Sequence, residues 1–202
     1  MVNAQAKTPK SFINVKDLGF AVVATDELTG TTYTNVTQTR GLQKISVETG
    51  GELKTAFADG LIIEAGNTDG SGKIGMTMHA IPAEIRKIIF NEKADEKGII
   101  SEVAGQQNNY VAVWFKRERR DGTYQLIGLT KVMFSNPKLE GETAKADWDF
   151  SSEDTDGTAM HRQSDRKRKI TWDSASALGT EADFFTELLK GAYKAAPPTQ
   201  VI

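Results

Sequence analysis

The sequence predicts a mainly β domain of the α+β class: a mostly antiparallel sheet that carries one helix, followed by a second helix near the C-terminus. Three observations support this. From Leu18 to Trp172, apolar residues recur at every second position, which is the period of a half-buried strand. Gly and Asp residues interrupt these runs, and Asp121 followed by Gly122 is a strong signal for a hairpin turn. Only two stretches have the spacing of an amphipathic helix.

The expected strands differ in how many of their faces are apolar. The run "LGFAVVAT" is apolar on both faces and predicts a buried strand. In "KADWDF", Trp148 and Phe150 face one way while Asp147 and Asp149 face the other. Strands are expected over residues 18–25, 43–48, 53–57, 73–80, 145–150 and 169–173, with two more joined by the turn within residues 110–132.

The first helix is expected near residues 82–92, in "IPAEIRKIIFNE". Pro82 suits the first helical position, and Ile85, Ile88 and Ile89 form one apolar stripe. This helix should end before Gly98.

The second helix is expected near residues 181–193, where Thr180 and Asp183 resemble a capping arrangement. Its apolar face predicts a docking surface, either on the core of the same chain or on a neighbouring molecule. That face consists of Phe184, Phe185, Leu188 and Leu189.

These elements suggest one domain with two extensions. We expect an N-terminal arm over residues 1–17, a β core over 18–173 and a C-terminal extension over 174–202. A length of 202 residues is enough for one hydrophobic core. The Pro-containing end "AAPPTQVI" cannot continue the helix.

Composition excludes several classes of protein. The net charge of -2 argues against a globally basic nucleic-acid binder. The chain has no cysteine, hence no disulfide, thiolate metal site or cysteine nucleophile. The N-terminus lacks the apolar core of a secretory signal, and no window approaches the roughly 20 apolar residues of a membrane span. We therefore expect a soluble protein that is first present in a cytoplasm.

The segment "NTDGSGKIGMTM" resembles two ligand-binding loops. In a calcium loop, Asn67, Asp69 and Ser71 would supply oxygen ligands, but Met78 stands where a bidentate Glu is needed. In a phosphate-binding loop, Gly66 is one place too early and Ile74 replaces the required Ser or Thr. We therefore expect a hairpin bend that leads into a strand, and no metal or cofactor.

No pattern of residues predicts a catalytic site. His79 and His161 are the only histidines, and neither has a second ligand nearby in the sequence. No nucleophile-elbow motif is present, and strand alternation places the aspartates of "KADWDF" on a solvent face. The expectation is a protein that is not an enzyme.

Two basic clusters, "KRERR" at residues 116–120 and "RKRK" at 166–169, raise the possibility of nucleic-acid binding. Both lie at strand ends or turns, where solvated charge is the default. A third alternative is that they meet the acidic stretch of residues 140–156 on a neighbouring subunit.

The order of segments resembles a known family. A strand ending in "IPAEIR" leads into a helix, and is followed by "GIISEV", by the hairpin "VAVWFKRERRDGTYQLIGLTKV" and by "NPKLEGETAKADWDF". The helix "DFFTELLKGAY" then follows a basic strand. Over residues 18–193 the chain resembles the major tail proteins, or tail-tube subunits, of long-tailed bacteriophages of Gram-positive hosts.

This resemblance implies a small β-sandwich or half-barrel with a flanking helix. It also implies homo-oligomeric rings, usually hexameric, whose inner strands line the lumen and which stack into a tube that conducts DNA during ejection. The implied partners are other copies of the chain, the tape measure, the tail terminator and the distal tail protein, with DNA in transit and no membrane. The implied location is the virion tail, after assembly in the host cytoplasm.

The leading hypothesis is therefore a structural virion protein that works by self-assembly. Phe184, Phe185, Leu188 and Leu189 are candidate assembly residues, and an arm over residues 1–16 and a polar loop over 37–60 are candidates for contacts between rings. Because a lumen that passes DNA should not bind phosphate, we expect an acidic or neutral lining, with the basic clusters facing outward or toward a neighbour. The alternatives are a tail-end or surface-binding module of the same fold and, third, a calcium-binding or enzymatic domain.

Overall fold

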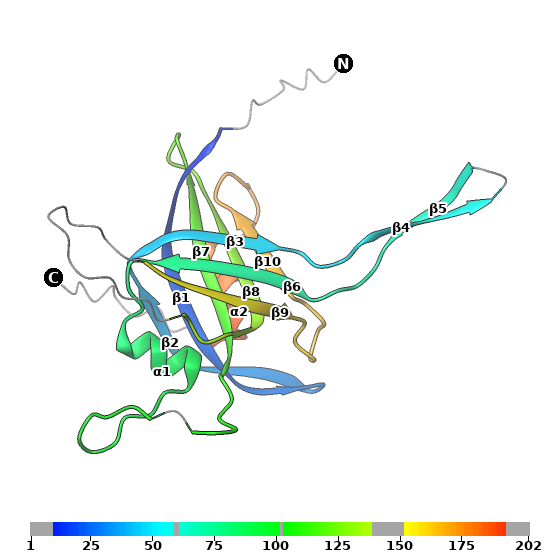
Figure 1. Ribbon diagram of the computed structural model, residues 1–202. Helices are drawn as coiled ribbons and strands as arrows, with labels where there is room; N and C mark the ends of the chain where they lie inside the picture. The colour runs from blue at the N-terminus through cyan, green and yellow to red at the C-terminus, as the bar shows by residue number, and fades with distance from the viewer. Residues whose placement is uncertain (1–9, 59–60, 102, 139–151, 193–202) are drawn as a thin grey trace, which may run out of the picture.

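The computed structural model describes residues 10–58, 61–101, 103–138 and 152–192. These residues form a strongly curved antiparallel sheet that folds over itself, with a helix beside it and a long hairpin that projects away from the body (Figure 1). The expected fold class, a mainly β half-barrel or sandwich with flanking helices, is confirmed.

The described part of the chain contains one eight-stranded sheet and one separate two-stranded hairpin. The order in the large sheet is β2-β1-β7-β8-β9-β6-β3, and β10 also pairs with β8. Its strands are β1 (Phe12–Glu27), β2 (Gly30–Thr39), β3 (Leu42–Glu48), β6 (Gly72–Met78), β7 (Tyr110–Arg119), β8 (Tyr124–Phe134), β9 (Glu153–Met160) and β10 (Lys169–Asp173). The separate hairpin consists of β4 (Leu53–Ala58) and β5 (Leu61–Asn67).

The sheet divides at β8. Its first half, up to Leu129, pairs with β10, and its second half, from Lys131, pairs with β9. Strands β9, β6 and β3 therefore leave the plane of β1, β7 and β8 and turn over it (Figure 1). The main core lies between these two parts and beneath α1 (Ala83–Phe90). It is built mainly from Leu18, Phe20, Ile74, Met76, Met78, Ile85, Ile89, Val111, Val113, Phe115, Leu129, Val132 and Phe134.

A second core covers the opposite face of the same strands. Because successive side chains of a strand point to opposite faces, Val113 enters the main core while Trp114 packs under α2 (Glu181–Leu189). Gly128 lets the helix lie close, since a Cβ there would be 2.8 Å from the Leu188 side chain. The strands are thus buried on both faces, as "LGFAVVAT" predicts.

Both helices end where a residue adopts the left-handed conformation. Asn91 ends α1 with φ 55°, so the helix stops well before Gly98, as expected. The expected cap of α2 is confirmed, because Thr180 and Asp183 bond reciprocally in a capping box. This helix ends four residues before position 193, since Lys190 and Gly191 both have positive φ.

Three sequence expectations need correction. Residues 37–60 are not a polar loop, because β3, β4 and the end of β2 lie within them. The segment from Asn67 to Gly72 is not a hairpin bend: β5 pairs with β4, whereas β6 pairs with β3 and β9. The expected boundary at residue 17 falls inside β1, which already pairs with β7 at Phe12.

Other expectations hold or fall outside the described residues. The strands expected at 43–48, 53–57 and 169–173, and the hairpin within 110–132, are all present. Strands β2, β5 and β9 were not expected, and β9 lies in a stretch whose acidic residues conceal its alternation. The expected strand 145–150 lies outside the described residues, as do the Pro-containing C-terminal end and the first nine positions.

Candidate assembly site

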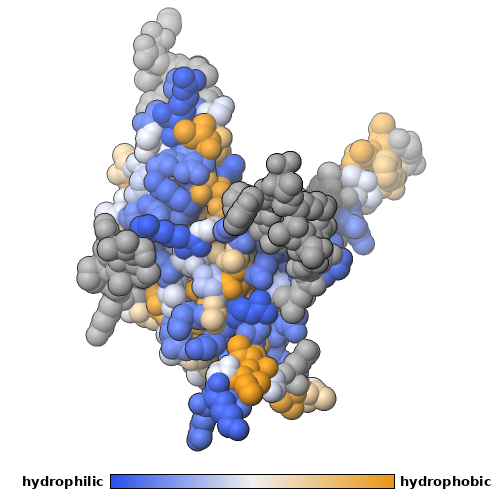
Figure 2. Space-filling view, turned by 60° about the vertical axis from the view of Figure 1, so that its left-hand side comes forward, coloured by the Kyte–Doolittle hydropathy of each residue, from blue (hydrophilic) through white to orange (hydrophobic). Residues whose placement is uncertain are grey.

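The hairpin of β4 and β5, hereafter the hairpin arm, exposes a cluster of large apolar side chains. Its two strands pair with each other and, among the described residues, with no other strand. Four large apolar side chains near its end are exposed: Phe57 by 66%, Leu61 by 71%, Ile62 by 60% and Ile63 by 66%. In Figure 2 the hairpin arm stands away from the body with hydrophobic residues near its tip.

Both faces of the tip are apolar. Phe57 lies opposite Ile62 across the hairpin, and Ala58 lies opposite Leu61. Leu61 and Ile62 are consecutive, so their side chains point to opposite faces. A register shift next to Phe57 leaves Ile63 as an extra residue. A hairpin with one apolar face could lie on a surface, whereas this tip matches a site that encloses it.

Elementary energetics also indicate a partner. Isolated two-stranded hairpins are at best marginally stable in water. Burying one Leu, Ile or Phe side chain contributes about 1.5–3 kcal/mol. If a partner buried all four side chains at the tip, the same measure gives a stabilisation of roughly 6–12 kcal/mol. A contiguous exposed apolar group of this kind marks an interaction site.

The root of the hairpin arm is glycine-rich and closely packed. A Cβ on Gly50 would lie 1.8 Å from the carbonyl oxygen of Ser71, so only glycine permits this approach. Gly51 has φ 125°, a backbone conformation that favours glycine. Glu52 and Thr68 join the two strands of the root, with the Thr68 amide donating to the Glu52 carbonyl at 2.9 Å.

A loop over residues 161–168, between β9 and β10, reaches this root. The Arg168 guanidinium donates to the carbonyl of Gly70 and, at 3.3 Å, to that of Gly50, so it bridges the two strands where they leave the body. His161 lies 3.5 Å from the carboxylate of Asp69. The segment that resembles a calcium loop therefore contains the second side of the root, residues 68–71, followed by strand β6. Among the described residues, no group of three or more His, Cys, Asp or Glu side chains could hold a metal ion.

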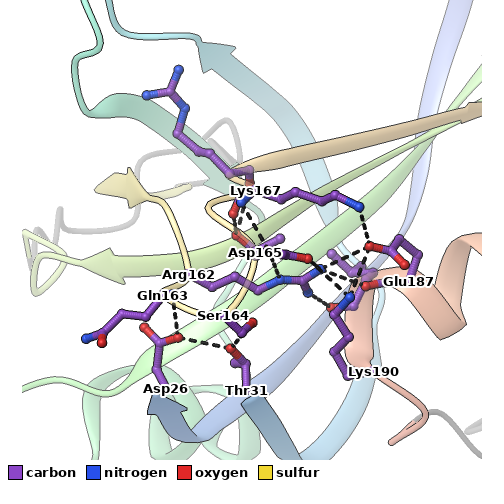
Figure 3. A network of polar contacts seen from close by, with 12 residues as sticks. Asp26, Thr31, Arg162, Gln163, Ser164, Asp165, Lys167, Glu187 and Lys190 are labelled. Carbon is purple, nitrogen blue, oxygen red and sulfur yellow. Dashed lines mark hydrogen bonds and ion pairs between the residues drawn. The ribbon is translucent and has the colours of Figure 1, made fainter. Parts of the chain in front are cut away.

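The same loop holds the end of α2 through Arg162, which extends toward Asp165 and Glu187 (Figure 3). The side chain of Arg162 is fully buried. Its guanidinium donates to the carbonyls of Leu188 at 2.8 Å and Glu187 at 3.1 Å, which are free at a helix C-terminus. It also forms a two-pronged pair with Asp165, at 2.7 and 2.6 Å. The hydrogen bond from Arg162 holds the pKa of Asp165 well below its usual range.

Neighbouring charges complete this network. Lys190 lies 3.1 Å from both the Asp165 and the Glu187 carboxylates, and Lys167 lies 2.6 Å from Glu187. The hydrogen bond from Lys167 lowers the pKa of Glu187. On the other side of the loop, Asp26 accepts from the backbone amide of residue 163 at 2.8 Å. The loop is thus joined to β1 as well as to α2.

The candidate residues of the C-terminal helix are used within the chain. Phe184 and Phe185 are each 3% exposed, and Leu188 and Leu189 are fully buried, in the core beside Trp114. The sequence left open whether this face docks on its own core or on a neighbour, and the structure has the first arrangement. At the start of the helix, Tyr124 donates to Glu181 at 2.6 Å, and this bond raises the pKa of Tyr124 to about 12.

The two basic clusters are engaged largely in contacts within the chain. In "KRERR", Lys116 lies 3.1 Å from Asp17, Arg117 stacks 3.8 Å over Phe12, and Arg119 pairs with Asp173. In "RKRK", Lys167 and Arg168 make the contacts described above. Charges that are neutralised or stacked in this way are poorly placed to grip phosphate.

Free sheet edges are a further candidate surface. Within the described residues, β2, β3 and β10 each pair with a strand on one side only. Strands β3 and β10 border an open groove of about 740 Å³, which includes Ile45, Phe115, Ile127 and Lys169 in its lining. Unpaired edges of this kind are templates for another strand. No helix in the described part of the chain is long and apolar enough to cross a membrane.

Comparison with known proteins identifies no family. No family model matches the chain, and no curated protein is similar to it in sequence. Among solved structures, it is similar to the cap of the anti-feeding prophage, a tube-terminating cap determined by cryo-electron microscopy. The TM-score is 0.47 and the identity 9%, over 86% of this chain and 99% of that one. A likeness of this size carries no statement about function.

Proposed function

We propose that this chain is a structural protein of a bacteriophage tail, a tube subunit that assembles with copies of itself into stacked rings and acts without catalysis. The observation that carries the proposal is the hairpin arm, whose tip is apolar on both faces and unpaired within the described chain. The unpaired edges of β2, β3 and β10 add to it, because ring closure is one way to satisfy sheet edges.

The energetics favour many contacts over one. Association of two proteins costs about 4–15 kcal/mol in lost freedom and ordering. The roughly 6–12 kcal/mol available at one tip is of the same size. A single inserted tip therefore gives a weak dimer at best, whereas a closed ring engages several tips and edges together. We therefore expect assembly to depend steeply on protein concentration.

In this proposal the ring lies in the virion tail, contacts the tape measure, terminator and distal tail proteins, and passes DNA through its lumen. These elements come from the resemblance to the major tail proteins. The same resemblance implies that a ring usually contains six subunits. The basic clusters are consistent with a lumen that does not hold DNA, because several of their members contact groups of the same chain.

Negative-stain electron microscopy of the purified protein tests this function. Rings and tubes at high protein concentration are expected, together with their loss in a Phe57→Ser, Ile62→Ser variant. Leu28 and Leu178 are each 81% exposed and lie outside the hairpin arm, so Leu28→Ser, Leu178→Ser is a matched control that should still assemble. Tubes formed equally well by the tip variant would contradict the proposed role of the hairpin arm.

The second candidate is a tail-end or surface-binding module of the same fold, favoured by the open groove between β3 and β10. Rings that never stack would assign the chain to a tail end. Strictly monomeric protein that binds a glycan or host surface protein would assign it to a binding module. Calorimetric binding of calcium near millimolar concentration would instead revive the third hypothesis.

A further inference from the structure

The 161–168 loop contacts two parts of the molecule that the sheet does not join directly, the root of the hairpin arm and the end of α2. We infer that Arg168 is a positioning residue that sets the direction of the hairpin arm, and that Arg162 holds Arg168 in place by fastening the loop to α2. The consequence for assembly rests on the proposed function, but the direction of the hairpin arm can be measured on the isolated protein.

The backbone of the root is rich in glycine. Its two chain segments pass through Gly50, Gly51 and Gly70, and glycine has the largest backbone freedom of any residue. The guanidinium of Arg168 offers several donors in one rigid plane. It uses them on the carbonyls of Gly50 and Gly70, one on each strand, and so restrains both strands relative to the body.

Hydrogen bonds hold the 161–168 loop in one conformation. The amide of Lys167 donates to Asp165, and the amide of Arg166 donates to the Arg162 carbonyl at 3.1 Å. Thr130 of β8 donates its hydroxyl to the Lys167 carbonyl at 2.6 Å and its amide to the Arg168 carbonyl at 2.9 Å. The backbone at Arg168 is therefore bound to the central sheet.

Arg162 secures the other end. It is a buried cation whose partners include the Asp165 carboxylate, the last carbonyls of α2 and the hydroxyl of Tyr33 on β2. A buried charge with this many partners has one preferred position, because moving it would leave several groups unsatisfied. Arg162 therefore fixes the start of the 161–168 loop at the end of α2, while Thr130 fixes its Arg168 end on β8.

Distance measurements between two spin labels test this inference. The chain has no cysteine, so Thr55→Cys on the hairpin arm and Glu84→Cys on α1 would be the only labelled positions. Both sites are exposed. Double electron–electron resonance on the dilute, unassembled protein should give one narrow distance distribution. Arg168→Ala should broaden and shift it, and Arg168→Lys should restore part of the narrow population.

The matched control is Arg166→Ala, which removes the same charge from the same loop at an exposed position. It should leave the distribution unchanged. Arg162→Lys, which contacts α2 and not the root, should also broaden the distribution. If that variant does not fold, Arg168→Ala decides alone. A distribution in Arg168→Ala identical to that of the parent would overturn the inference, whether or not the protein forms tubes. Loss of tubes in the tip variants with unaltered label distances would support the proposed function and would leave the inference about Arg168 untouched.

Discussion

The hairpin arm and helix α2 each carry four large apolar side chains, and they end in opposite environments. In α2 the four, Phe184, Phe185, Leu188 and Leu189, are no more than 3% exposed. On the hairpin arm the four, Phe57, Leu61, Ile62 and Ile63, are at least 60% exposed. The difference lies in what faces them. The sheet offers α2 a complementary surface, whereas nothing in the described chain covers the tip.

The two regions also differ in how they are fastened. The start of α2 has a capping box, its face packs on Trp114 and Gly128, and its end is bound by Arg162. Within the described residues, the hairpin arm is restrained near its root alone, where Arg168 bridges two glycine carbonyls. We therefore expect changes in α2 to alter folding and changes at the tip to alter association.

The largest expected effect is on the buried face of the helix. Leu188→Ala removes a fully buried side chain over Gly128 and should lower the free energy of unfolding by about 2–5 kcal/mol. Urea unfolding followed by circular dichroism measures this. A change below about 0.5 kcal/mol, the range of an ordinary surface substitution, would show that α2 is not part of the cooperative core.

A smaller effect is expected at the helix cap. Thr180→Ala removes the hydroxyl that accepts from the Asp183 amide and should cost about 1 kcal/mol of stability. Thr180→Ser keeps the hydroxyl and should remain close to the parent in the same urea titration. Equal loss in both variants would mean that the methyl group, and not the cap, stabilises this end.

Stability should also depend on pH through the network at the end of α2. The pKa of Asp165 is lowered by its hydrogen bond from Arg162, and that of Glu187 by its bond from Lys167. Both carboxylates therefore bind protons more weakly in the folded state than in the unfolded state, so their contribution is present at neutral pH. It should begin to disappear as the pH falls through the ordinary values of 4.5 and 3.8, and continue to fall below them.

Thermal melting between pH 7 and pH 2 measures this dependence. Asp165→Asn should be less stable at pH 7 and should lose less stability on acidification than the parent. Parallel curves for the two proteins would show that the Arg162–Asp165 pair does not contribute to the acid sensitivity of the fold.

The smallest effect on folding is expected at the tip of the hairpin arm. Ile62→Ser exposes no new surface within the chain, so the free energy of unfolding should change by less than about 0.5 kcal/mol. Sedimentation velocity at high concentration should nevertheless show weaker association than the parent. A loss of stability comparable to that of Leu188→Ala would mean that the tip packs on the body in solution.

Local patterns were sufficient for much of the fold. The turn at Asp121 and Gly122, the cap at Thr180 and the strand "KITWD" each depend on residues close together in the chain, and each was predicted. Strand β9 was missed because polar residues, Asp154, Asp156 and Thr158, occupy its exposed positions and small residues its buried ones, so little apolar alternation remains. The segment "LIIEAGN" of β5 was not identified as a strand at all.

Most of the candidate site could not be predicted from the sequence. Arg162 and Arg168 lie within or beside a cluster of charge that resembles a solvated turn. Apart from Asp165, their partners are 25 to 129 residues away in the chain. No short-range pattern signals that one loop will meet both a helix end and a glycine-rich root. The exposure of the tip is equally non-local, since apolar strand residues are usually part of a core.

By itself, the sequence determined which segments are strands and helices wherever the cause is local: side-chain period, capping and turn chemistry act between residues a few positions apart. It also determined that α2 has an apolar face in need of cover. Only the tertiary structure decided that this face is covered by the chain's own sheet while the hairpin arm is left uncovered. The reason is that burial depends on which distant surfaces meet: α2 meets the sheet face that carries Trp114 and Gly128, whereas no described element meets the tip.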